Sequence, residues 1–323
     1  MNAEIVTAVV LGAMGLVVAV LITGLIVRFY RGRRHVDQMW TAVHFPALKD
    51  IGTVQHLTIL PLIDMKPARS DLAGEAGVSY LVRADNTCIL FDVGLNLRGV
   101  HPSPLVHNMQ ALGVTLEQMQ YIVISHLHSD HVGGIKNQMK HTFDLSSHPP
   151  DLNAIPAFVP TPMTHSTAKV EVVDGPRVIA PGIATLGAIP RQLFWFGQTL
   201  EQSLAINVEG KGVVLIIGCG HPTIQRIVQR AELLLDQPIY GVIGGLHYPV
   251  TALPVQRSLG TDNWPWNPIN KKDVSTSIEF LKQRHLGIVA VSSHDSCDWT
   301  IESFRQAFCE AYQDILIGKE ILV

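Results

Sequence analysis

The sequence shows little charge imbalance, no cysteine pairing and no repetition that would place it in a specialised class of protein. Its formal net charge is −3 over 323 residues, so nothing indicates the basic surface of a nucleic-acid-binding protein. Its cysteines form no CxxC pair and are widely spaced, which argues against a disulfide framework (Cys88, Cys219, Cys297 and Cys309). We find no internal repeat and no low-complexity tract. The length fits one large or two modest domains.

Charge is also absent from one long stretch near the N-terminus. The residues from Ile5 to Val27 include no charged side chain, and they account for a mean hydropathy as high as +0.24. A run of about 20 apolar residues is long enough to cross a bilayer as a helix. A cleaved signal peptide has a basic start and a shorter apolar core, whereas this chain begins Met1-Asn2-Ala3-Glu4. The run therefore predicts one membrane-spanning anchor.

The residues after this run set the expected orientation of the anchor. Arginines cluster between Arg28 and Arg34, and basic residues next to a membrane span stay on the cytoplasmic side. The N-terminus should then face outward, and the rest of the chain should lie in the cytoplasm. Small residues spaced four apart, Gly15, Ala19 and Thr23, would allow close approach of a second helix, so a homodimer is an alternative to a monomer.

The chain divides by pattern into three segments. Residues 1–34 are the predicted transmembrane anchor with its basic flank, and residues 35–55 form a juxtamembrane linker without a clear period. From residue 56 onward, short apolar runs separated by turns predict strands, joined later by amphipathic helices. The segment 141–162, rich in Pro, Ser and His, is expected to be a loop over a site rather than core. Two β-sheets packed back to back with helices outside would fit the whole of residues 56–323.

One short stretch carries the strongest chemical signal. The apolar run Tyr121–Ile124 leads directly into Ser125-His126-Leu127-His128-Ser129-Asp130-His131. Imidazoles and a carboxylate this close together repel when charged and lose hydration when buried, unless a cation lies among them. His126 and His128 can address one metal ion, and Asp130 and His131 a second ion nearby. The stretch therefore predicts a metal centre.

Further histidines stand where other predicted strands end. His221 follows Gly218-Cys219-Gly220, His247 follows Gly244-Gly245-Leu246, and His294 follows Ser292-Ser293. The end of a strand is a rigid place from which a sheet presents a side chain to a shared cleft. We therefore expect these histidines beside the loop from His126 to His131.

The pattern His-x-His-x-Asp-His followed by Gly133-Gly134 resembles the metallo-β-lactamase superfamily. The resemblance implies an α+β fold, an αββα sandwich with metal ions at one edge, here preceded by one transmembrane helix. Four stretches narrow the resemblance to the dihydropterin-synthase-like branch, whose namesake forms a dihydropterin–aminobenzene ribofuranosyl phosphate: Gly74–Ser79, Glu201–Leu204, Gly218–Pro222 and Gly244–His247. It covers roughly Gln55 to the C-terminus, so residues 56–323 would be the catalytic domain.

The sequence departs from the superfamily at two expected ligands. No histidine lies in Leu186–Arg191, where a Gly-His-Thr turn is expected, and Gly218-Cys219 replaces an expected Gly-Asp turn. We expect His221 to complete the first site with His126 and His128. Asp130, His131 and His294 would form the second site. Cys219 would bridge the ions as a thiolate or lie outside the ligands, and Asp92 would either orient the histidine loop by hydrogen bonding or serve only as a turn residue.

The resemblance also implies the chemistry. Zn²⁺ is the expected cofactor, as one or two ions, with Mn²⁺ or Fe²⁺ as alternatives. The leading hypothesis is a hydrolase that uses metal-activated water on an ester or phosphoester of a small-molecule substrate. Asp130 would accept the proton of the water, His247 would donate to a leaving group or hold an anion, and Arg191 is a candidate anion contact. A transferase like the namesake and a non-catalytic ligand sensor are the alternatives.

Overall fold

The computed structural model describes residues 3–323. The helices are α1 (Ala3–Ala42), α2 (Pro104–Ala111), α3 (Ile135–Lys140), α4 (Ile224–Leu234), α5 (Pro254–Ser258), α6 (Lys271–Lys282) and α7 (Asp298–Phe308). The strands are β1 (Leu57–Ile63), β2 (Ser79–Ala84), β3 (Thr87–Phe91), β4 (Tyr121–Val123), β5 (Pro156–Val159), β6 (Lys169–Val172), β7 (Arg177–Ala180), β8 (Ile183–Thr185), β9 (Ile189–Leu193), β10 (Gly197–Glu201), β11 (Leu204–Val208), β12 (Gly212–Ile217), β13 (Ile239–Gly244), β14 (Ile288–Val291) and β15 (Ile321–Leu322).

Two mixed sheets make the centre of the domain. The first has the order β15-β1-β2-β3-β4-β5-β6, and the second has the order β14-β13-β12-β11-β8-β7. Strands β3 to β6 run parallel to one another, as do β12, β13 and β14. Parallel neighbours end at the same edge of a sheet. The loops that leave β12, β13 and β14 therefore lie at one edge of the second sheet, and the loop that leaves β4 lies at the same end of the sandwich.

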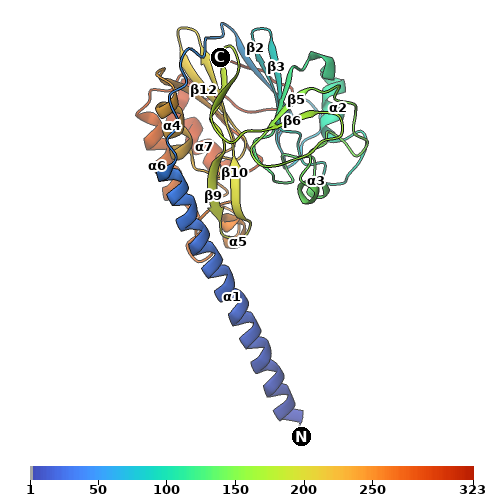
Figure 1. Ribbon diagram of the computed structural model, residues 1–323, viewed down its shortest axis with the longest axis vertical. Coiled ribbons are helices and arrows are strands. Elements are labelled where there is room, and N and C mark those ends of the chain that lie inside the picture. Colours follow the sequence, from blue (N-terminus) through green and yellow to red (C-terminus); the bar gives the residue numbers. More distant parts are fainter. Residues whose placement is uncertain (1–2) are drawn as a thin grey trace.

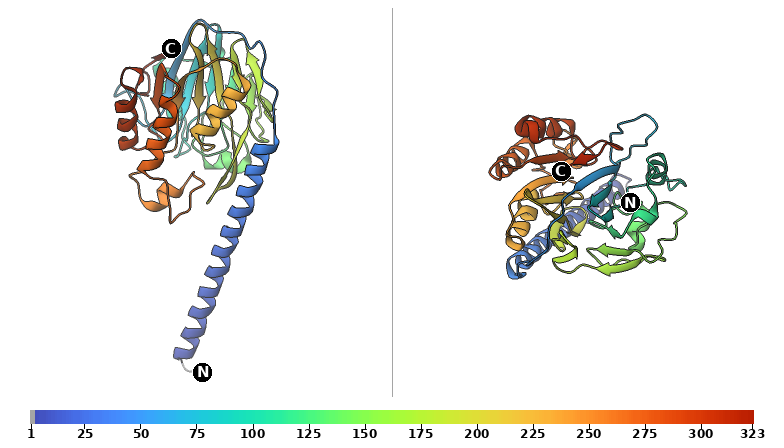
Figure 2. Two further views of the ribbon diagram at one scale, coloured as in Figure 1. Left: turned by 90° about the vertical axis from the view of Figure 1, so that its left-hand side faces the viewer. Right: turned by 90° about the horizontal axis from the view of Figure 1, so that it is seen from above.

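Three apolar cores hold the layers together. The core between the sheets joins side chains of both, such as Tyr80 and Phe91 from the first and Ile206 and Val214 from the second. A second core packs α2 against the outer face of the first sheet. The third packs α4, α6 and α7 against the outer face of the second sheet. The layers are therefore helix, sheet, sheet and helix (Figures 1 and 2), which confirms the predicted αββα fold with one long helix before it.

Helix α1 projects far beyond the domain (Figure 1). It contains an 18-residue window of mean hydropathy 2.9, none of which is buried against the rest of the chain. Its C-terminal part lies on the domain instead, where Phe29 is buried with its ring 5.3 Å from Phe194 and 5.0 Å from Trp264. The Asp37 carboxylate pairs with Arg226 at 2.6 Å. One helix is thus both the candidate membrane span and a docked part of the domain.

The structure corrects several sequence-based expectations about local structure. Helix α1 continues to Ala42, so the first residues of the predicted 35–55 linker are helical. The segment 141–162 is not a surface loop, because Phe143 and Leu152 are fully buried and β5 lies within the first sheet. The two-stranded ribbon of β9 and β10 was not predicted either.

Candidate metal centre

The histidines singled out in the sequence converge at the edge where the parallel strands end. His126, His128 and His131 lie on the loop after β4, whereas His221 follows β12, His247 follows β13 and His294 follows β14. Three groups of ligand atoms form there, each with all its atoms within 4.8 Å of one another, and two of them share no residue. The first group is His126, His128 and His221, and the second is Asp130, His131, Cys219 and His294.

The first group has the spacing of a zinc site. The distance from His126 Nε2 to His128 Nδ1 is 3.1 Å, and His221 Nε2 lies 3.1 Å from His128 Nδ1 and 3.2 Å from His126 Nε2. Nitrogens that share one tetrahedral zinc ion at about 2.0–2.1 Å are separated by about 3.3 Å. Three imidazole nitrogens in this arrangement repel one another unless a cation lies between them. The donor set therefore fits a transition-metal ion.

The second group places a thiol between two imidazoles. Cys219 Sγ lies 3.1 Å from His131 Nε2 and 3.2 Å from His294 Nε2, and Asp130 Oδ2 lies 3.5 Å from His131 Nε2. The sulfur also falls within a third group with His221 and His247. Cys219 therefore lies among the candidate ligand atoms rather than behind them, at the position where the sequence lacks the expected carboxylate.

Backbone and carboxylate acceptors fix which ring nitrogen of each histidine carries the proton. His131 Nδ1 lies 2.7 Å from the buried Asp92 carboxylate, and His221 Nδ1 lies 2.7 Å from the carbonyl oxygen of Gly260. Because these acceptors take the Nδ1 protons, Nε2 of each ring keeps a lone pair for the cluster. An acceptor on the far nitrogen is typical of histidines that bind metals.

For two other histidines the acceptor on Nδ1 is a serine hydroxyl, which in turn donates to a buried aspartate. Ser125 donates through Oγ to Asp92 Oδ2 at 2.6 Å and so accepts from His126 Nδ1 at 3.0 Å. On the other sheet, Ser292 donates to Asp64 Oδ2 at 2.5 Å and accepts from His294 Nδ1 at 2.6 Å. Both aspartates follow strands of the first sheet, Asp92 after β3 and Asp64 after β1, and each orients a histidine through a serine hydroxyl.

Burial keeps the histidines of the first group neutral. It holds the pKa of His126 and of His221 well below the ordinary histidine value, and it lowers the pKa of His128 to about 4. Burial disfavours the charged form of Asp130 too, but its interactions with His131, His294 and His128 outweigh this effect and bring the pKa of that carboxyl below its usual range. Neutral imidazoles and an ionised carboxylate are the forms that bind metal ions.

Glu201 is a functional residue that sequence reasoning did not assign. It is buried, and its carboxylate accepts hydrogen bonds from the backbone N–H groups of Cys219, Gly220 and His221 at 3.0, 2.8 and 2.8 Å. Burial raises the pKa of Glu201 to about 7. The residue therefore fixes the loop that carries two candidate ligands. The Glu201–Leu204 stretch pointed to this residue, because it resembles the dihydropterin-synthase-like branch, but the resemblance did not indicate what Glu201 does.

Replacing Glu201 with glutamine should weaken metal binding without removing a ligand. The glutamine would keep one acceptor oxygen but turn an NH₂ group toward one of the backbone donors. Loss of such an outer partner costs about 10–100-fold in metal affinity. Competition with a chromogenic chelator measures the change, and the exposed Glu209→Gln is the matched control. Equal affinity in both variants would show that Glu201 does not position the loop.

His247 and Arg191 take positions that modify their expected roles. His247 Nε2 donates to the carbonyl of Leu259 at 2.6 Å, and its buried Nδ1 has no hydrogen-bond partner among residues 3–323. His247 therefore offers a proton acceptor rather than the expected donor. Arg191 lines a second cavity, which His221 and His247 also line, but its guanidinium is already paired there with Asp262 at 2.6 Å.

A cavity of about 290 Å³ opens beside the cluster. Its polar lining includes His128, Asp130, Cys219, His221 and His247, and apolar side chains complete the wall, among them Leu95, Phe196 and Leu259. Gly260 also lines it, at φ +70°, and a Cβ there would lie 2.3 Å from the His247 ring. The residues at the strand ends and the loop that carries Leu259 and Gly260 therefore form a pocket large enough for the reacting group of a small molecule.

Known proteins share both the motif region and the fold. Residues 72–182 match the metallo-beta-lactamase superfamily. The chain is 27% identical over 317 residues to the 7,8-dihydropterin-6-methyl-4-(beta-D-ribofuranosyl)-aminobenzene-5'-phosphate synthase of Methanocaldococcus jannaschii, an alignment that covers 85% of this chain and 99% of the relative.

Two solved structures are similar over most of the chain. One is a metal-dependent hydrolase of the beta-lactamase superfamily, with 19% identity, a TM-score of 0.58 and coverage of 83% of this chain and 99% of the other. The second is the metallo-beta-lactamase fold protein YhfI from Bacillus subtilis, with 12% identity, a TM-score of 0.53 and coverage of 83% and 100%. At these identities the likeness concerns the fold.

Proposed function

Because this chain contains a metallo-beta-lactamase domain, we propose that it is a membrane-anchored, metal-dependent hydrolase of ester or phosphoester bonds. One observation carries the proposal. The two groups of ligand atoms lie beside the same cavity, with His128, Asp130, Cys219 and His221 all in its wall. Zinc held there would lower the pKa of a water toward neutrality and polarise a phosphoryl or carbonyl oxygen.

The residues around the cavity have separate tasks in this proposal. The first group, His126, His128 and His221, would hold one ion, and Asp130, His131 and His294 would hold the second, with Cys219 Sγ as a further donor between the histidines. Asp130, ionised and at the cavity wall, accepts the proton of the attacking water. The lone pair on His247 Nδ1 accepts a hydrogen bond from a hydroxyl or a protonated oxygen of the substrate.

A transferase is the second candidate, and the sequence relationship favours it. The relative from Methanocaldococcus jannaschii is named a synthase, and it aligns over 99% of its own length with this chain. The same pocket would then exclude water and bind two substrates in turn. A non-catalytic ligand sensor would use the cavity without turnover.

We propose that the domain lies on the cytoplasmic side of a membrane. The apolar window of α1 is not buried in the domain, and the arginines between Arg28 and Arg34 follow it directly. Basic residues flanking a span are retained in the cytoplasm. A cysteine-accessibility or protease-protection assay on sealed cells tests this orientation, and digestion of the domain from the outside would reverse it.

The enzymatic proposal is tested on the full-length protein in detergent. Metal content is measured by mass spectrometry, and turnover is screened with ester, phosphomonoester and phosphodiester model substrates. We expect one or two metal ions per chain, turnover that is lost in a chelator, and loss of both in His128→Ala. The exposed His148→Ala is the control. Bound metal without turnover on any ester would refute the hydrolase.

A separate arm distinguishes the candidates. The protein is incubated with a dihydropterin donor and 4-(β-D-ribofuranosyl)aminobenzene 5'-phosphate, and the coupled product is sought by mass spectrometry. Coupling in place of hydrolysis would favour the synthase. Neither activity, with metal bound, would favour the sensor.

A further inference from the structure

Helix α1 marks which part of the domain lies at the membrane surface. The uncharged run ends at Val27 and Arg28 follows, so the border between acyl chains and headgroups falls near these residues if α1 spans the bilayer. The docked residues begin immediately afterwards, at Phe29. Because a helix rises about 1.5 Å per residue, whatever contacts Arg28 to Tyr30 lies within a few ångströms of that border.

The turn between β9 and β10 and the loop around Trp264 lie at this level. Arg28 Nη2 donates to the carbonyl of Trp195 at 3.1 Å, and the ring of Tyr30 lies 4.9 Å from that of Trp264. Gly197, the first residue of β10, lines one hollow together with Gly24 and Val27 of the apolar run. Figure 1 shows β9, β10 and α5 at the end of the domain where α1 leaves it.

Exposed apolar side chains gather on these elements. We call Trp195, Phe196, Leu253, Val255 and Trp266 the apolar rim; each is more than a third exposed, and Leu253 reaches 70%. The rim is continuous, because Trp195 Nε1 donates to Ser258 Oγ of α5 and the ring of Phe194 lies 4.9 Å from that of Trp195 and 6.4 Å from that of Trp266. Tryptophan is enriched where proteins meet the membrane–water interface.

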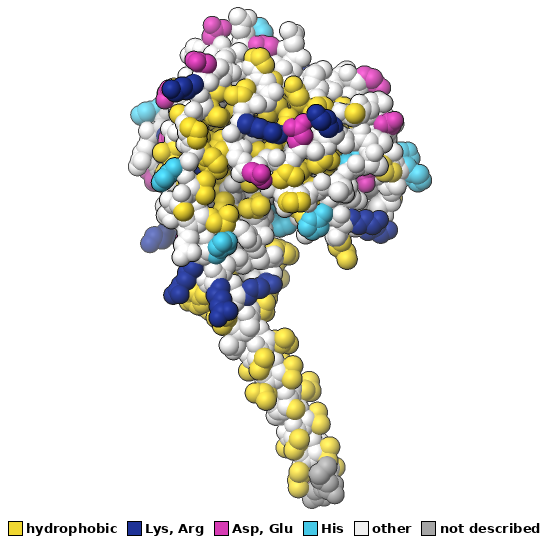
Figure 3. All heavy atoms as spheres, in the orientation of Figure 1, with side chains coloured by type: hydrophobic (Ala, Val, Ile, Leu, Met, Phe, Trp, Pro, Cys, Tyr) yellow, Lys and Arg dark blue, Asp and Glu magenta, His cyan; other side chains and the backbone are white. Residues whose placement is uncertain are grey.

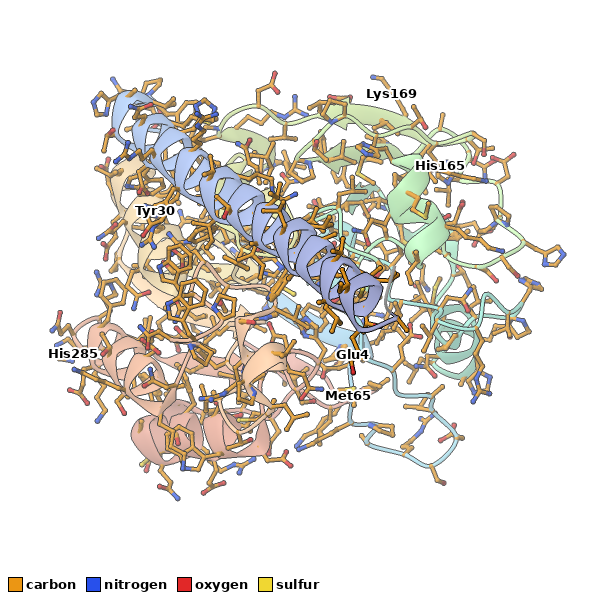
Figure 4. The ribbon with its side chains drawn as sticks, turned by 90° about the horizontal axis from the view of Figure 1, so that it is seen from below. Glu4, Tyr30, Met65, His165, Lys169 and His285 are labelled. Carbon is orange, nitrogen blue, oxygen red and sulfur yellow. The ribbon has the colours of Figure 1, made fainter. Side chains whose placement is uncertain are left out.

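The charges near the rim also fit an anionic lipid surface. Within the loop of residues 253–270 the charged side chains are Arg257 and Asp262, and Asp262 is neutralised by Arg191 and Arg33. Figure 3 shows Lys and Arg side chains around hydrophobic ones where the helix leaves the domain. Figure 4 shows the same end of the domain from below, with Tyr30 labelled. Basic residues near a membrane surface are attracted to anionic headgroups.

The rim borders the cavity of the metal centre. Phe196 belongs to both, because its ring lies 5.3 Å from that of His128 and its side chain lines the cavity. Leu259, next to α5, lines the same cavity. A molecule lying in the bilayer with its polar group at headgroup level would therefore be separated from the candidate metal ligands only by the side chain of Phe196.

We propose that the apolar rim docks on the lipid surface and that the cavity takes its substrate from there. The substrate is then a membrane-resident amphiphile whose ester or phosphoester lies near the headgroup, while its apolar tail remains in the bilayer. The substrate class rests on the proposed hydrolase function. The docking of the rim does not, since it follows from the position of α1 and the exposed side chains.

Docking is tested by tryptophan quenching in vesicles of phosphatidylcholine with a minor fraction of phosphatidylglycerol. The full-length protein is reconstituted with lipids brominated near the headgroup end of the acyl chain. We expect quenching of its fluorescence, most of which is lost in Trp195→Phe/Trp266→Phe. Trp299→Phe, on α7 and away from the rim, should leave the quenching unchanged. Quenching that is absent, or that persists in the double variant, would overturn the docking.

The substrate class is tested by comparing two esters of one chromophore. One carries a long acyl chain and partitions into the vesicles, and the other is water-soluble. Leu253→Ser/Val255→Ser should lower turnover of the long-chain ester several-fold and leave that of the soluble ester unchanged. Equal effects on both esters would overturn the membrane substrate. Loss of turnover on every ester, with quenching retained, would refute the hydrolase but not the docking.

Discussion

Replacing His221 with alanine should empty the first ligand group and lower kcat/KM by more than the roughly 100-fold that loss of an outer partner costs. His221 Nε2 lies 3.1 Å from His128 Nδ1 and 3.2 Å from His126 Nε2, so it closes a triangle that the other two histidines leave open. It comes from the second sheet, whereas its partners come from the first. Its loss therefore removes the link between the sheets at this site.

The measurement is metal stoichiometry together with turnover, compared with the exposed His148→Ala. A stability control separates metal loss from misfolding. In a chelator the variant and the original protein should unfold at nearly the same temperature, because metal no longer stabilises either. Unchanged metal content in His221→Ala, with activity retained, would show that the third ligand has been assigned wrongly.

Asp92→Ala should be the most destabilising single change at the site. The Asp92 carboxylate is fully buried and accepts from Ser125 N, Ser125 Oγ and His131 Nδ1 at 2.6, 2.6 and 2.7 Å. Removing one partner of a buried charged pair, here the Asp92 carboxylate, lowers the free energy of unfolding by about 3–5 kcal/mol. The backbone at Asp92 has φ +60°, which costs alanine about 1–2 kcal/mol more.

Asp92→Asn separates the charge from the backbone strain, because asparagine tolerates this conformation. The amide cannot accept from all these donors, so we expect metal affinity to fall while part of the stability returns. Chemical denaturation and chelator competition measure the two effects. Asp85→Asn is the matched control, since Asp85 also has a positive φ, at +49°, but lies exposed in the β2–β3 turn. Equal losses of stability in both variants would contradict the account.

The sequence predicted the parts of the fold that local patterns determine. The histidine loop and the strand ends at His221, His247 and His294 were predictable because each joins an apolar run to a turn with Gly or Ser. The β2–β3 hairpin was predictable from the turn residues Asp85 and Asn86 between two apolar runs. The rule that parallel strands end at one edge brings His221, His247 and His294 together, and the packing of the two sheets brings this edge to the histidine loop after β4. The αββα layering followed from the order of strands and helices.

Other parts could not be predicted because their stability comes from distant contacts. Strand β5 lies in a stretch rich in turn residues, and only its pairing with β4 and β6 makes it a strand. The β9–β10 ribbon is held by packing against α1, where Phe29 meets Phe194. Local propensity carries no information about such partners.

The supporting residues of the site were hidden for the same reason. Glu201 is separated by 20 residues from His221, whose backbone it holds, and Asp64 by 229 residues from Ser293. A carboxylate in a sequence does not show which N–H groups it will accept from. Cys219 was weighed as a bridging thiolate or an outer residue, and the structure places its sulfur between His131 and His294.

The central claim is that two buried groups of side chains at the end of the sandwich bind metal ions. Anomalous diffraction at the zinc absorption edge, from crystals of the protein grown with zinc, tests it most directly. We expect one peak bounded by His126, His128 and His221, and a second, where two ions bind, bounded by Asp130, His131 and His294 with Cys219 Sγ. An anomalous map without a peak in either group would contradict the account.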